Sequence, residues 1–173
     1  AWPGAEDASY DAYLSTLAAV GDELQRQAIE VRFVCSQTKM DPPVVDRVKE
    51  RMRCNAVGAR VVAVKTVDEY LRAVGGACVL VGSRLHALIL ALVVGTPVVA
   101  ISAVRKVRRQ LTDIELPDHA FDLRSVRIPE LLARVDEILR HQDSLRNQIV
   151  ERTQEFRRQL EAGFDRLADL IPR

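Results

Sequence analysis

Apolar positions in this sequence follow two patterns, a helical spacing of three or four residues and short continuous runs. The first predicts amphipathic helices and the second predicts strands buried on both faces. The predicted helices are Tyr10–Gln27, Asp41–Cys54, Thr66–Val74, Ser83–Val94, Val104–Leu111 and a long stretch, Pro129–Leu170, broken near His141–Ser144. The predicted strands are Ile29–Cys35, Arg60–Val64, Cys78–Val81, Pro97–Ser102 and a short extended piece, Ala120–Leu123.

This alternation of strands and helices predicts a doubly wound α/β fold with a mostly parallel sheet. In such sheets ligands bind outside the carboxyl ends of strands, where the following helices begin. The segment 82–86 lies at such a junction, because it links a predicted strand to the most apolar predicted helix. We therefore expect a ligand site there.

Segment Gly82–Leu92 (GSRLHALILAL) places two basic side chains at the start of this helix. Between residues 79 and 94 the only side chains with polar chemistry are Ser83, Arg84 and His86. The positive end of the helix dipole disfavours cations, and a broken local rule of this kind is typical of functional sites. An anion bound at the helix start would resolve the conflict.

The first four residues of the candidate anion site are Gly82, Ser83, Arg84 and His86. Gly82 allows backbone or ligand to approach closely, and we expect Ser83 to cap the helix. Arg84 and His86 then project from the first turn beside free backbone N–H groups. The structural alternative is that Arg84 pairs with a carboxylate such as Asp113 and that His86 is a hydrogen-bonded core histidine.

Composition narrows the class of protein. The 173 residues suffice for one domain with a core, and 48% hydrophobic with 28% charged residues is ordinary for a globular protein. The net charge of +1, with dispersed basic residues, gives no basis for nucleic-acid binding. The longest apolar run, Ala87–Val94, is far too short for a membrane span. Three cysteines without close metal-ligand spacing favour a reducing cytoplasm over a disulfide framework: Cys35, Cys54 and Cys78.

Around the candidate site the chain resembles the polysaccharide pyruvyl transferase family. The matching segments are GSRLHA (82–87), AL (91–92), GTPVVAIS (95–102), Lys106-Val107 and the stretch 111–116; strand 31–34 with Gln37 and Asp41 also fits. The resemblance implies a Rossmann-like half of a GT-B-type fold, covering most of residues 5–123. Residues 1–127 would form the donor-binding domain. Residues 128–173 would form a helical extension that packs on it or crosses to a partner domain, and the N-terminal half of the enzyme would be absent.

The resemblance also implies a reaction, the transfer of a pyruvyl group from phosphoenolpyruvate to a sugar, with ketal formation. The acceptor would be a cell-surface polysaccharide or its lipid-linked precursor, and no cofactor or metal is implied. Arg84 would bind the phosphate or carboxylate of the donor, with Gly82 and Ser83 beside it, and His86 would act as acid or base. Lys106 would be a further anion contact. The resemblance implies a cytoplasmic enzyme, either free in the cytoplasm or at the inner face of the membrane.

Two positions depart from the family pattern. Ala103 and Val104 stand where the family commonly carries an aromatic residue and an aspartate, which predicts altered or lost substrate contacts. Two other functions stay open: a GT-B-type glycosyltransferase using a nucleotide sugar, with Asp113 or Glu115 on the ribose, and a non-catalytic partner-binding module. The basic run 105–109 is either a solvated face or a peripheral membrane contact, and self-association also stays open.

Overall fold

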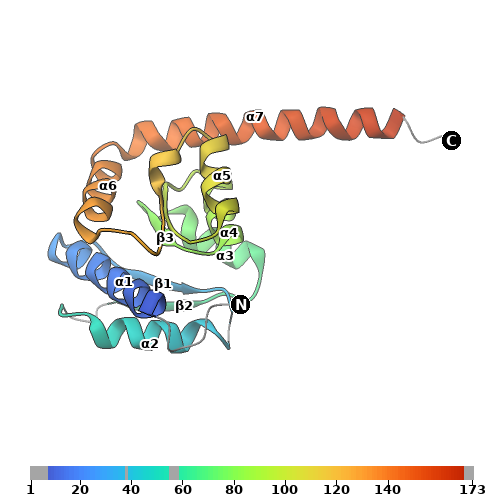
Figure 1. Cartoon of the computed structure of the whole chain (residues 1–173). Helices are drawn as coiled ribbons and strands as arrows, with labels where there is room; N and C mark the ends of the chain where they lie inside the picture. Colours follow the sequence, from blue (N-terminus) through green and yellow to red (C-terminus); the bar gives the residue numbers. More distant parts are fainter. Residues whose placement is uncertain (1–7, 38, 55–58, 170–173) are drawn as a thin grey trace.

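The computed structural model describes residues 8–37, 39–54 and 59–169 (Figure 1). Each predicted helix and strand is present, with its ends shifted by a few residues; Leu170 lies outside the described residues. The strands are β1 (Arg32–Cys35), β2 (Arg60–Ala63), β3 (Leu80–Gly82), β4 (Val98–Ile101) and β5 (Ala120–Phe121). The helices are α1 (Ala8–Arg26), α2 (Asp41–Arg51), α3 (Val67–Gly75), α4 (Leu85–Val93), α5 (Arg105–Asp113), the short 3-10 turn η2 (Pro117–His119), α6 (Ile128–Arg140) and α7 (Gln142–Asp169).

The strands pair in parallel, as predicted, but in two separate ladders. β1 pairs with β2, and β3, β4 and β5 form a second sheet in that order. Parallel neighbours need helical crossovers, which the intervening helices supply. The mixed α/β architecture with short parallel strands confirms the predicted Rossmann-like fold class.

Helices cover both faces of the strands, and β4 shows this in its side chains. Val99 and Ile101 join the core formed with α1, α2 and α6, whereas Val98 and Ala100 join the core formed with α3, α4, α5 and α7. Successive side chains of a strand point to opposite faces, so a strand buried in two cores must be apolar throughout. All four residues of β4 are fully buried, which explains its continuous apolar run.

The C-terminal helical stretch divides where the sequence predicts, because α6 ends at Arg140 and α7 begins at Gln142. α6 buries Leu131, Val135 and Ile138 in the first core. α7 contributes Ile149 to the second core and then runs beyond α5 (Figure 1). On this distal part four large apolar side chains are exposed: Phe156, Leu160, Phe164 and Leu167.

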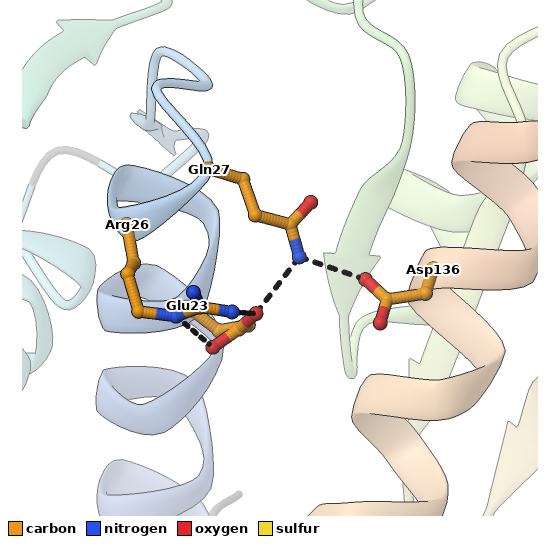
Figure 2. Close-up of polar contacts among 4 residues, drawn as sticks. All are labelled: Glu23, Arg26, Gln27 and Asp136. Carbon is orange, nitrogen blue, oxygen red and sulfur yellow. Dashed lines mark hydrogen bonds and ion pairs between the residues drawn. The ribbon is translucent and has the colours of Figure 1, made fainter.

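A polar contact joins the first helix to the C-terminal stretch (Figure 2). Gln27, at the end of α1, donates from Nε2 to Oε1 of Glu23 at 2.8 Å and to Oδ1 of Asp136 on α6 at 2.9 Å. Arg26 pairs with the same glutamate, and the pKa of Glu23 falls to about 2 because the side chain accepts these hydrogen bonds. The exposed contact supplements the apolar packing of α1 on α6.

Within the described ranges, the helices are too short or too polar for any of them to cross a membrane. The three cysteines are free thiols; Cys35 is buried in β1, and Cys78 is half-buried ahead of β3 rather than inside the strand. Burial raises the pKa of the Cys35 thiol, with Asp41 and Asp46 adding to the effect.

Candidate functional site

The predicted junction lies at the carboxyl ends of β1, β2 and β3. The segments that follow these strands carry Ser36, Thr66 and Arg84, and all three line one surface pocket. Parallel strands direct their carboxyl ends toward the same edge, so residues distant in sequence meet there.

Arg84 is the N-cap of α4 rather than a residue of its first turn. Its backbone is extended (φ −84°, ψ 121°), and its carbonyl accepts the first helical hydrogen bond, from the N–H of Leu88 at 3.1 Å. The prediction that Ser83 caps the helix is wrong, because α4 begins two residues later and no side chain caps it. The backbone N–H groups of residues 85–87 therefore have no partner from a capping side chain.

The guanidinium of Arg84 is held by a carboxylate at the start of α2. Its Nη2 donates to Oδ1 of Asp41 at 2.6 Å, and the side chains are 34% and 15% exposed. The second oxygen of Asp41 accepts from the backbone N–H of Gln37 at 2.7 Å and from the hydroxyl of Ser36 at 3.4 Å. The structural alternative for Arg84, a pair with a carboxylate, is therefore confirmed, but the partner is Asp41. Asp113, the example suggested from the sequence, instead has its Oδ2 4.0 Å from Nε of Arg109.

Ser83 contacts a residue that the sequence analysis missed. Its hydroxyl lies 3.1 Å from the phenol of Tyr13 on α1. Tyr13 is buried, which raises the pKa of its phenol, so it stays a neutral hydrogen-bonding group. The only signal for it in the sequence is its position four residues before Leu17 on the apolar face of α1.

His86 lies at the second position of α4 and is exposed, so it is not a core histidine. It lines a pocket of about 470 Å³, the outer pocket, together with Lys65, Thr66 and Arg84. An exposed imidazole beside a guanidinium at a helix start is available to a ligand. The structural alternative for His86 is therefore wrong.

A second hollow lies on the other side of Arg84. This inner cavity of about 240 Å³ lies between the β1 and β3 strands and is lined mainly by apolar side chains of α1, β1 and β3. Arg84 and Tyr70 line both hollows. The Tyr70 phenol donates to the carbonyl of Ala87 at 3.1 Å, and burial raises its pKa to about 12. Arg84 thus lies where the outer pocket and the inner cavity meet.

Two other predicted site residues have different surroundings. Gly82 lines the inner cavity, and a Cβ atom added there would meet nothing within 4 Å, so the space directly beside it is open. Lys106 lies exposed at the start of α5 and lines neither hollow. Ala103 and Val104, the departures from the family pattern, are exposed just before it.

The comparison with protein families places the site within a matched range. The sequence model of polysaccharide pyruvyl transferases matches residues 3–103, more than half of the chain. The matched range contains Tyr13, Asp41, Arg84 and His86 and ends before Lys106. A search of curated proteins found no match.

Proposed function

The chain belongs to the polysaccharide pyruvyl transferase family, and from this premise we propose that its carboxyl-edge site transfers a pyruvyl group from phosphoenolpyruvate to a sugar. The product is a ketal on a polysaccharide or its precursor. The single observation that carries the proposal is the start of α4, where Arg84 and His86 flank an uncapped helix N-terminus and line the outer pocket.

Anion binding at this edge is supported by a contrast between neighbouring helices. The hydroxyl of Thr66 caps α3 by accepting from the N–H of Glu69 at 3.2 Å, and two acidic residues lie in its first turn. α4 has neither a side-chain cap nor an acidic residue there. Free N–H groups and an arginine fork together suit a phosphate or carboxylate. α5 is likewise uncapped and begins with Arg105 and Lys106, which suits a further anion contact.

The reaction requires a proton to be added and protons to be removed. Carbon 3 of phosphoenolpyruvate gains one proton and becomes a methyl group, while carbon 2 accepts two sugar oxygens. The carbon–oxygen bond to phosphate breaks, and of the two hydroxyl protons released, one balances the proton on carbon 3 and the other leaves with phosphate. His86 is the residue that we assign to this proton transfer, since an imidazole serves as acid or base near neutral pH. Arg84 and the N–H groups of α4 stabilise the leaving phosphate.

A nucleotide-sugar donor has less support. The acidic residues considered for a ribose contact, Asp113 and Glu115, lie at and after the C-terminal end of α5, the opposite end from Lys106. Glu115 is also paired with Arg152 of α7. Neither carboxylate lines the outer pocket with Arg84.

Thermal unfolding of the full chain tests the proposal. Phosphoenolpyruvate should raise the melting temperature, whereas a nucleotide sugar should not. In a second assay, on a full-length enzyme that includes the N-terminal half, His86→Ala should lower the rate of phosphate release in the presence of a glycan acceptor by about 100-fold or more. The matched control is His141→Ala, which removes another exposed histidine, outside this site. Protection by a nucleotide sugar alone, or full turnover by His86→Ala, would refute the assignment.

A further inference from the structure

We propose that Asp41 is a positioning residue that presets the Arg84 guanidinium for the anionic donor. The inference rests on the proposed function, because it assigns to Arg84 a bound phosphate or carboxylate. Its basis is the 2.6 Å contact between Oδ1 of Asp41 and Nη2 of Arg84 at the rim shared by the inner cavity and the outer pocket.

Asp41 is itself fixed from the other side. Its Oδ2 accepts from the backbone N–H of Gln37 at 2.7 Å, and Ser36 adds a weaker contact at 3.4 Å. The carboxylate therefore ties the loop after β1 to the loop after β3. With 15% of its side chain exposed, Asp41 is the more buried and the better anchored partner, and Arg84 takes its orientation from it.

The contact leaves most of the arginine fork available. Only Nη2 is engaged, and no other hydrogen bond of this guanidinium occurs within the described part of the chain. A guanidinium carries five N–H donors in one plane, so fixing one edge aims the remaining donors. An unpaired arginine would instead lose the freedom of several rotatable bonds when the donor binds, which lowers affinity.

A competing account treats Asp41 only as a negative charge that opposes an incoming anion. The two accounts differ in what they expect from variants of equal charge. Asp41→Asn and Asp41→Ala both remove the charge and the oxygen that accepts from the N–H of Gln37, but the asparagine carbonyl can still accept from Arg84. Positioning predicts that the alanine variant binds phosphoenolpyruvate about three- to ten-fold more weakly than the asparagine variant. Charge alone predicts equal affinities, both tighter than that of the unsubstituted chain.

The experiment measures the dissociation constant of phosphoenolpyruvate by calorimetry on the full chain and its variants, with melting temperatures as a check on folding. The pair Asp46→Asn and Asp46→Ala provides the matched control, because Asp46 is an exposed carboxylate on the same helix. In an Arg84→Lys background, the difference between the alanine and asparagine variants at position 41 should disappear. If Asp41→Ala does not fold, Asp41→Glu decides, since it keeps the charge but displaces the carboxylate by one methylene and should weaken binding.

The outcomes distinguish a failure of the positioning role from a failure of the proposed function. If phosphoenolpyruvate binds the unsubstituted chain but Asp41→Ala and Asp41→Asn bind equally well, the positioning role is refuted and the proposed function stands. The same holds if the difference persists in the Arg84→Lys background. If phosphoenolpyruvate does not bind the unsubstituted chain, the proposed function fails, and the positioning role fails with it.

Discussion

Replacing Gly95 with alanine should destabilise the helix that carries the site, for two separable reasons. Gly95 follows the C-terminal end of α4 with φ +73°, a left-handed conformation that glycine adopts without strain. Its N–H donates to the carbonyl of Leu92 at 2.9 Å, and the next N–H, of Thr96, donates to that of Ala91 at 2.9 Å. A Cβ at this position would lie 2.9 Å from Cγ2 of Val150 on α7.

The expected cost follows from these two terms. The left-handed conformation costs an alanine about 1–2 kcal/mol, partly offset by the reduced flexibility of the unfolded chain. The contact adds about 1–3 kcal/mol, because valine is held in one rotamer in a helix and its methyl group cannot turn away. We expect Gly95→Ala to lower the free energy of unfolding by about 2–4 kcal/mol in total.

A double-mutant cycle separates the terms. Val150→Ala alone should cost less than about 1 kcal/mol, since Val150 is partly exposed. Adding Val150→Ala to Gly95→Ala should recover the stability lost to the steric contact and leave only the cost of the backbone strain. Urea denaturation followed by circular dichroism measures all four free energies. A coupling energy near zero would show that α7 does not pack against the end of α4 as described.

Three further outcomes are expected from the same assay. Thr96→Val should cost about 1–3 kcal/mol, because the fully buried hydroxyl donates to the carbonyl of Val74 at 2.8 Å; an unchanged midpoint would contradict this. Arg146→Met should cost about 1–2 kcal/mol by removing the donor that lies 3.0 Å from the carbonyl of Ala77 after α3, and equal stability would refute that role. Burial lowers the pKa of His119 below its ordinary 6.5. Its neutral form therefore contributes stability that is complete above about pH 6.5 and is lost as the pH falls through the folded pKa. His119→Gln should flatten that dependence, and a slope identical to that of the unsubstituted chain would count against it.

The elements of this fold were predictable because their signals are local. Leu14, Val20 and Leu24 lie on the buried face of α1, as their spacing predicts. The break between the two C-terminal helices falls at His141, inside the predicted interval. The start of α4 was misplaced by two residues, because a tertiary contact rather than a cap occupies Ser83: its hydroxyl is hydrogen-bonded to Tyr13.

The residues of the candidate site likewise divide into those with a local signal in the sequence and those without one. Arg84 and His86 were predicted from a local conflict, two basic side chains at the start of an apolar helix, and no other chain segment is needed to see it. The sequence marks Asp41 only as a helix start and as part of the family pattern, and its contact with Arg84 spans 43 residues. Tyr13 lies 70 residues from Ser83 and shares no pattern with it.

By itself, then, the sequence determined which segments form strands and helices, which helix start carries the basic residues, and the family to which the chain belongs. Only the tertiary structure decided which carboxylate faces Arg84, that His86 is exposed, and that an apolar cavity separates β1 from β3. The physical reason is distance along the chain. Periodicity and capping act within a few residues. Which residues meet at a carboxyl edge depends instead on which parallel strands lie side by side in the folded chain.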